Sequence, residues 1–98
     1  MAIKTAIIGL GIMGQRMLEQ MLLHPEFLVN TIWDPDSTAC QSAQKLAPDT
    51  LIASNAKAAF SNVDLVYLAC PPKPRKAYAL MASAQGKAVF LELSLIHI

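Results

Sequence analysis

Charged side chains are scarce in this chain of 98 residues. Asp, Glu, Lys and Arg make up 15% of it, against about 25% in an average protein, while hydrophobic residues make up 54%. The net charge is +1 and no basic patch stands out, so there is no electrostatic signal for binding nucleic acid or an acidic membrane. We therefore expect neither partner, and interpret the chain as one apolar domain with a core of marginal size.

Long apolar segments are missing as well. The longest runs end well before the roughly 18 residues that suggest a membrane-spanning helix. The N-terminus lacks the basic stretch and long apolar run of a secretory signal. Repeats, low-complexity tracts and flexible linkers are also absent, so no domain boundary is expected inside the chain. These absences favour a cytoplasmic protein.

Cysteine and histidine are few, and their spacing fits neither a metal site nor a redox pair. Cys40 and Cys70 form no Cys-x-x-Cys pair, and His24 and His97 fall at no metal-ligand spacing. A catalytic cysteine would need a basic partner, which the sequence does not supply. We expect two free buried thiols and no metal site, and we assign no residue as a catalytic acid or base.

Glycine is sparse too, yet three of the four glycines fall in one turn. Gly9, Gly11 and Gly14 follow an apolar run over 3–8, typical of a buried strand, and open a segment with helical spacing. In such a Gly-x-Gly-x-x-Gly turn, the first glycine permits the bend, the second admits a pyrophosphate and the third lets helix pack on strand. Free N–H groups and the helix dipole make the helix start a site for phosphate. An ordinary glycine-rich turn is the alternative.

An acid stands where dinucleotide binding requires one. The second apolar run, over 27–33, ends at Asp34, which lies 20 residues after Gly14 (34 minus 14). The fingerprint expects an acid at about this distance to accept hydrogen bonds from the adenosine ribose. The competing interpretation is a turn acid ahead of a helix, because Pro35 and Asp36 follow. A carboxylate there repels a 2′-phosphate, which favours NAD over NADP.

Strands and helices alternate along the rest of the chain. Right-handed crossovers between them predict an α/β fold with a Rossmann-type doubly wound parallel sheet of strand order 3-2-1-4-5. Its crevice would bring residues 9–13 opposite 70–72. The remaining expected elements are a helix from Asp36 or Ser37 to Pro48, a strand over 51–53, a short helix from Ser54 or Asn55 to Phe60, a strand over 65–69, a stiff non-helical loop over 70–74, a helix ended by Gly86 and a strand over 88–92.

Apolar residues at helical spacing predict the buried face of each long helix. The expected stripes are Met13, Met17, Leu18, Met21 and Leu22 in the first, Ala39, Cys40, Ala43, Leu46 and Ala47 in the second, and Ala77, Tyr78, Leu80, Met81 and Ala84 in the last.

Three motifs together resemble the N-terminal half of the glucose-fructose oxidoreductase / inositol dehydrogenase (Gfo/Idh/MocA) family. They are Ala6 to Gly14, Asp64 to Pro72 and Gly86 to Glu92, and the resemblance spans positions 3 to 92. It implies an NAD(P)-dependent oxidoreductase that moves hydride to or from a sugar- or cyclitol-like small molecule. A separate α/β domain would supply most substrate contacts. The parent protein is expected to be a homo-oligomer.

The resemblance also implies further contacts to the cofactor. The Pro-Pro loop would lie along the adenosine and nicotinamide side, and Glu92 near the nicotinamide ribose. The complete predicted cofactor site is Gly9, Gly11, Ile12, Met13, Gly14, Asp34, Ala69, Cys70, Pro71, Pro72 and Glu92.

Two departures from the family pattern concern catalysis. Leu93 and Ser94 follow Glu92 where the family has Lys-Pro, and Arg75 stands where it often has His. We therefore expect this chain to hold a cofactor without catalysing a reaction. A non-catalytic regulatory module is one alternative. The N-terminal domain of a β-hydroxyacid dehydrogenase is another, although Asp34 and the Pro71-Pro72 pair argue against it.

The tail over 93–98 has its own interpretation. Read back as the codons CTG TCT CTT ATA CAC ATC, it is similar to the transposase adapter used to prepare sequencing libraries. We interpret 1–92 as a partial NAD(P)-binding domain and 93–98 as a non-native tail, which would also explain the missing lysine. The alternative is a genuine apolar strand end.

Resequencing the source DNA across codon 93 tests this interpretation. We expect genomic sequence that diverges from these codons after position 92. The same codons in intact genomic DNA would rule the adapter out.

Overall fold

The computed structural model describes residues 2–91, in which strands and helices alternate. The elements are β1 (Ile3–Ile8), α1 (Ile12–Leu22), β2 (Phe27–Trp33), α2 (Ser37–Leu46), β3 (Leu51–Ile52), α3 (Ala56–Ala59), β4 (Leu65–Leu68), α4 (Pro72–Ala84) and β5 (Ala88–Leu91). All strand pairs are parallel, and the order is β3-β2-β1-β4-β5. The predicted sheet and its topology are confirmed.

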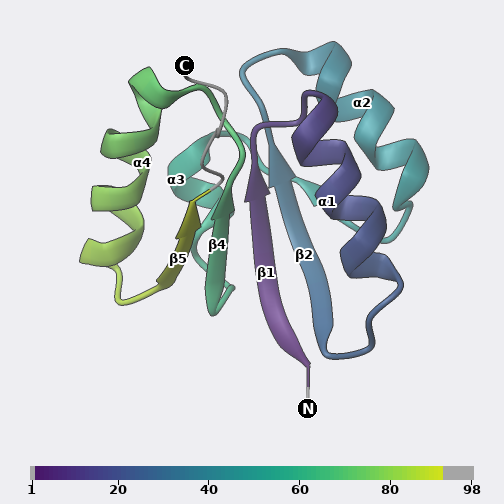
Figure 1. The fold of residues 1–98 in the computed structure, drawn as a ribbon, viewed down its shortest axis with the longest axis horizontal. Coiled ribbons are helices and arrows are strands. Elements are labelled where there is room, and N and C mark those ends of the chain that lie inside the picture. The colour runs from purple at the N-terminus through teal and green to yellow at the C-terminus, as the bar shows by residue number, and fades with distance from the viewer. Residues whose placement is uncertain (1, 92–98) are drawn as a thin grey trace, which may run out of the picture.

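The helices cover the two faces of the sheet in pairs. Figure 1 shows α1 and α2 together on one side of β1 and β2, and α3 and α4 on the other side. Successive side chains of β1 pack against opposite helix layers. Ile7 packs with α1 and α2, while Ala6 and Ile8 pack with α3 and α4. Because both faces are covered, β1 reads as a continuous apolar run rather than an alternating one.

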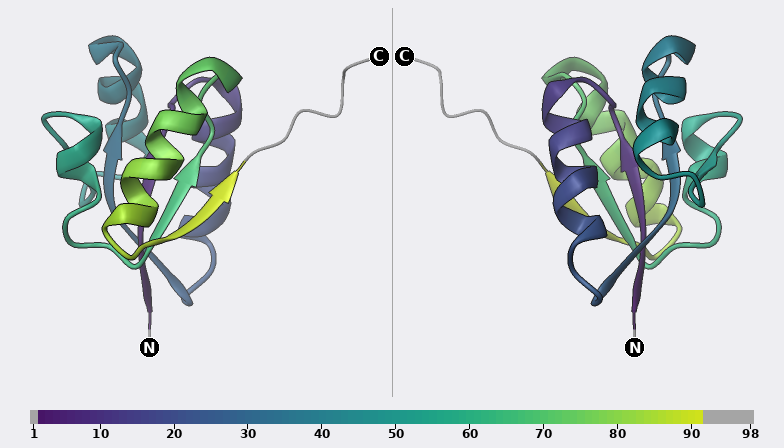
Figure 2. Two further views of the ribbon diagram at one scale, coloured as in Figure 1. Left: turned by 90° about the vertical axis from the view of Figure 1, so that its left-hand side faces the viewer. Right: turned by 90° about the vertical axis from the view of Figure 1, so that its right-hand side faces the viewer.

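The register of the three central strands brings their ends to one level. Ile8 pairs with Trp33 of β2 and with Leu68 of β4. The next residues, Gly9, Asp34 and Ala69, therefore leave the sheet side by side at its carboxyl edge. Figure 2 shows from two sides that the start of β1 and the turn after it lie at opposite ends of the sheet. In such sheets, ligands bind at this edge, where the strand order reverses.

The expectation of a non-helical loop over 70–74 is wrong beyond its first two residues, because α4 begins at Pro72 and runs through Pro74. Pro71 is its N-cap residue. The first four N–H groups of a helix have no partner inside it, so a proline in the first turn removes no hydrogen bond. The prolines thus mark the start of the helix instead of excluding it.

Two of the predicted helix faces need correction. In α1, Leu18 and Met21 are buried, but Met13 and Leu22 are exposed. The buried face of helix α4 differs more from the predicted one, because Leu80 is 62% exposed and Ala82 is fully buried. Tyr78 and Ala79 pack beside Ala82 against the β4 layer. The small alanines allow the helix to approach the sheet closely, which turns the larger Leu80 and Met81 outward.

The second helix agrees better with expectation. Its N-cap is Asp36, whose carboxylate accepts a hydrogen bond from the N–H of Thr38 at 2.9 Å. Cys40 and Ala43 are buried, whereas Leu46 is 41% exposed. Both cysteines are free and buried, as predicted. None of the helices within residues 2–91 is long and apolar enough to span a membrane.

Phe60, fully buried at the end of α3, tests the packing of the α3 and α4 layer. We expect Phe60→Ala to lower the free energy of unfolding by about 3–5 kcal/mol, because it removes a large core side chain and leaves a cavity. Leu80→Ala, at an exposed position, should change it by less than about 0.5 kcal/mol. Urea unfolding followed by circular dichroism measures both. Equal losses would contradict the described orientation of α4.

Candidate functional site

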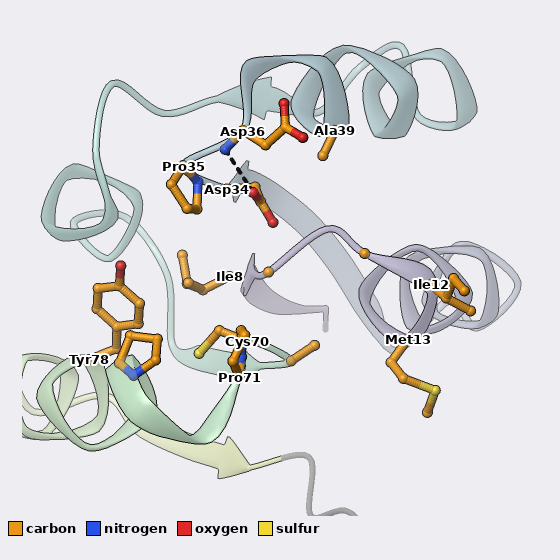
Figure 3. A pocket seen from close by; sticks show the side chains of 14 residues that line it. Ile8, Ile12, Met13, Asp34, Pro35, Asp36, Ala39, Cys70, Pro71 and Tyr78 are labelled. Atoms are coloured by element: carbon orange, nitrogen blue, oxygen red, sulfur yellow. Dashed lines mark hydrogen bonds between the residues drawn. The ribbon is translucent and has the colours of Figure 1, made fainter.

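A cavity of about 530 Å³ opens at the carboxyl edge of the sheet, where β1, β2 and β4 end. Figure 3 shows side chains from the two sides of the crevice facing this space, with Asp34 and Pro35 across from Cys70, Pro71 and Tyr78. Its lining residues are Ile8, Gly9, Gly11, Ile12, Met13, Asp34, Pro35, Asp36, Ala39, Ala69, Cys70, Pro71, Pro74 and Tyr78. The predicted approach of the glycine turn to the loop after β4 is confirmed.

Gly9 makes the closest approach between the two sides of the crevice. Its φ is +97°, and a Cβ atom there would lie 2.6 Å from the backbone nitrogen of Cys70. Its N–H donates to the carbonyl oxygen of Trp33 at 2.9 Å. A side chain at this position would be strained by the backbone and would push β1 away from the loop after β4.

The other two glycines of the turn serve different purposes. A Cβ atom on Gly14 would collide with the carbonyl oxygen of Gly9, so this glycine lets α1 pack directly on the turn. A Cβ atom on Gly11 would meet no described atom within 4 Å. Gly14 therefore supports the site from behind, while Gly11 keeps the space above the turn open. This division matches the roles expected of the motif.

Asp34 joins the end of β2 to the glycine turn. One carboxylate oxygen accepts the N–H of Leu10 at 2.7 Å, and the other accepts the N–H of Asp36 at 2.8 Å. The side chain is half-buried and lines the cavity. Each carboxylate oxygen can accept more than one hydrogen bond. Asp34 therefore retains acceptor capacity for a hydroxyl group in the cavity.

The start of α1 is the electropositive part of the site. Its N-cap residue is Gly11, and the first turn, within the described part of the chain, has neither a side-chain cap nor an acidic residue. The first N–H groups therefore have no partner inside the helix. Ile12 and Met13 line the cavity, and they are 78% and 45% exposed. Such a helix end suits an anion, above all a phosphate.

The wall after β4 is apolar and fixed in position. The guanidinium Nη2 of Arg75 donates to the carbonyl oxygen of Cys70 at 3.0 Å, which ties the loop to α4. Burial raises the pKa of the Cys70 thiol, and the effect of Asp34 adds to it, although Arg75 acts in the opposite direction. A protonated thiol is a poor nucleophile. Cys70, with only 5% of its surface exposed, forms part of the apolar wall.

Sequence reasoning missed part of the lining. Pro74 and Tyr78 lie four residues apart on α4, a spacing that places both on one helix face. The ring of Tyr78 packs edge-on against Trp33, with the ring centroids 6.2 Å apart. Extending the predicted helix through the prolines would have revealed this pair. The other lining residues missed are Ile8, Pro35, Asp36 and Ala39.

Three further residues were predicted for the site. Gly14 packs behind the turn, and Pro72 begins α4. Glu92 lies outside the described residues. The arrangement that results offers N–H groups for an anion, carboxylates for hydroxyl groups and flat apolar surfaces for a ring. It can hold and orient a nucleotide.

Comparison with known proteins points the same way. The sequence model of an oxidoreductase family with an NAD-binding Rossmann fold matches residues 3–93. No curated protein sequence matches the chain.

Several solved structures share the fold at low sequence identity. Myo-inositol 2-dehydrogenase from Lactobacillus plantarum is 21% identical, with a TM-score of 0.85, over 93% of this chain and 28% of that one. Myo-inositol dehydrogenase from Lactobacillus casei, solved with NAD(H) and myo-inositol, is 20% identical, with a TM-score of 0.85, over 93% and 28%. Biliverdin reductase from Synechocystis sp. PCC 6803, solved with biliverdin and NADP⁺, is 22% identical, with a TM-score of 0.87, over 95% and 30%. The chain thus spans less than a third of each of these proteins.

The different environments of Gly14 and Gly11 give a direct test of the turn. We expect Gly14→Ala to lower the free energy of unfolding by about 1–3 kcal/mol or more, because the new methyl group overlaps the backbone of Gly9. Gly11→Ala should cost less, about 1 kcal/mol or below, because its methyl group meets no described atom and only the poorer N-cap preference of alanine counts. Chemical denaturation of the two variants measures the difference. A Gly14→Ala protein of wild-type stability would contradict the packing of α1 on the turn.

Proposed function

This chain belongs to the Gfo/Idh/MocA family of oxidoreductases and is its NAD-binding Rossmann domain, and on that premise we propose which residues hold the cofactor and what the parent protein does. The observation that carries the proposal is the convergence of the glycine turn, Asp34 and the loop after β4 on one cavity. The described residues fit a dinucleotide, since the space above Gly11 is open and the start of α1, which has no side-chain cap, lines the cavity.

The pyrophosphate would rest on the amides of Gly11, Ile12 and Met13. Asp34 would accept hydrogen bonds from the adenosine ribose, which places the adenine beyond it, toward Pro35 and Tyr78. The nicotinamide half would extend the other way, along Ala69, Cys70, Pro71 and Pro72. When bound, the nicotinamide supplies the hydride chemistry, and the residues of this chain bind and orient it.

The charge of the ribose end supports NAD as the preferred cofactor. Asp34 and Asp36 both line the cavity where a 2′-phosphate would lie; the carboxylate of Asp34 points into it (Figure 3), and that of Asp36 accepts the N–H of Thr38 beside it. Their negative charge would repel that phosphate, and no arginine lines this wall among the described residues. A preference for NAD over NADP follows from the same two carboxylates.

The activity of the parent protein is a further part of the proposal. The chain spans 28% of each of the two inositol dehydrogenases, so the larger part of those proteins has no counterpart here. We assign the parent the transfer of hydride between NAD and a carbinol or carbonyl group of a sugar- or cyclitol-like substrate. This chain would contribute cofactor binding, and the residues that contact the substrate would lie elsewhere.

The location of the parent protein and its assembly are also part of the proposal. Two free buried thiols suit the reducing cytoplasm. Phe90 stacks on Tyr67 with the ring centroids 5.2 Å apart, yet 55% of its surface is exposed. Exposed apolar surface of this kind supports a covering surface in the parent, from its own chain or from another subunit of a homo-oligomer.

A fluorescence titration with NADH tests the cofactor proposal. We expect the folded chain to bind NADH more tightly than NADPH, and Asp34→Ala to weaken NADH binding about tenfold or more, because ribose hydroxyls lose a charged acceptor. Asp49→Ala, an exposed acid in the α2–β3 connection, serves as the control and should bind as the wild type does.

Two outcomes would contradict the proposal. A folded wild-type chain that binds neither nucleotide would refute the cofactor site. Tighter binding of NADPH than of NADH would refute the role given to the two carboxylates.

A further inference from the structure

Both peptide groups that flank Leu10 are held by side chains. The Leu10 N–H, which belongs to the Gly9–Leu10 peptide, donates to Asp34 at 2.7 Å. The Leu10 carbonyl, which belongs to the Leu10–Gly11 peptide, accepts from the side-chain Nε2 of Gln15 at 2.9 Å. In a trans peptide the N–H points opposite to the carbonyl, so the N–H of Gly11 points away from Gln15. The Gly11 N–H is the first amide of the proposed phosphate site. Its direction is thus set by the hydrogen bonds that hold the two peptide groups of Leu10.

Leu10 itself cannot move to compensate for a lost bond. Its side chain is fully buried in the core between the sheet and the α1 and α2 layer. Without Asp34, its buried N–H would lack an acceptor at a cost comparable to a broken hydrogen bond, and the turn would relax to recover one. The bond to a carboxylate is short and charge-assisted, which makes it one of the stronger bonds of its kind.

We propose that Asp34 is a positioning residue for the phosphate cradle as well as a ligand of the ribose: by fixing the Leu10 peptide it sets the amides of the glycine turn in their phosphate-binding orientation. This inference rests on the proposed function, because it describes how the same cavity binds a diphosphate. It adds a role that does not require the ribose hydroxyls at all.

The two roles of Asp34 predict opposite results for a ligand without those hydroxyls. If Asp34 acts through the ribose alone, its charge is only a disadvantage to such a ligand, since a carboxylate repels a diphosphate. Removing the charge would then leave binding unchanged or strengthen it. If Asp34 also positions the turn, removing it must weaken binding even when the hydroxyls are absent.

ADP and 2′,3′-dideoxy-ADP are the probes, because they differ only in the ribose hydroxyls. We would titrate each into the wild-type chain, Asp34→Ala and Asp64→Ala at low salt, following backbone amide shifts by NMR. Asp64 is the matched control, since its carboxylate also accepts a backbone N–H, that of Lys4 at 3.3 Å, and it does not line the cavity. Circular dichroism and urea unfolding establish that each variant is folded.

We expect Asp34→Ala to weaken the binding of 2′,3′-dideoxy-ADP about three- to tenfold, because the Leu10 N–H loses its acceptor, and that of ADP by a larger factor. The amide signals of Leu10 and Gly11 should shift in the ligand-free variant, whereas Asp64→Ala should bind both probes as the wild type does. If Asp34→Ala does not fold, Asp34→Glu replaces it. That variant keeps the charge but displaces the carboxylate from Leu10, so it should also weaken the dideoxy probe.

Equal or tighter binding of 2′,3′-dideoxy-ADP by the variant overturns the positioning role alone, provided that the wild type binds NADH. A folded wild type that binds neither NADH nor ADP overturns the proposed function, and this inference with it.

Discussion

One charged hydrogen bond, from the N–H of Leu10 to the carboxylate of Asp34, ties together the two strands on which the site depends. Beta-strands β1 and β2 end at the same level, because Ile8 pairs with Trp33. The next residues could diverge, since Gly9 turns away with φ of +97°. The carboxylate of Asp34 holds them together through the N–H of Leu10. Its other oxygen accepts the N–H of Asp36, the N-cap of α2. The carboxylate of Asp34 thus links the end of β2, the glycine turn and the start of α2.

The sheet is built so that this junction is rigid. Beta-strand β1 lies between β2 and β4, and its residues from Thr5 to Ile8 are fully buried. The one polar side chain among them, that of Thr5, donates to the carbonyl of Ile3 at 3.1 Å, so no buried hydroxyl in this strand is left unpaired. With helices packed on both faces, the carboxyl edge is where the backbone is free to meet a ligand. The cavity lies at this edge for that reason.

The sequence predicted the architecture well because its strongest signals are local and strict. Three glycines at fixed spacing and an acid 20 residues later (34 minus 14) leave few alternatives for a βαβ unit. The helix faces were harder to predict, because they depend on which side chains allow two layers to approach. In α4, Ala79 and Ala82 decide the orientation, and the more hydrophobic Leu80 and Met81 lie outside. Hydrophobicity alone does not report that preference.

The start of α4 explains why Pro74 and Tyr78 were missed in the cavity wall. Tyr78 and Pro74 reach the site only because α4 begins at Pro72, a start that depends on the unpaired N–H groups of a first helical turn. The glycine motif also contains less information about the ligand than its length suggests. Gly9 and Gly14 are required by contacts of the protein with itself, and only Gly11 faces open space. A glycine turn of this kind therefore specifies a close strand-to-helix junction first, and it becomes a phosphate site where Asp34 and the loop after β4 complete the surroundings.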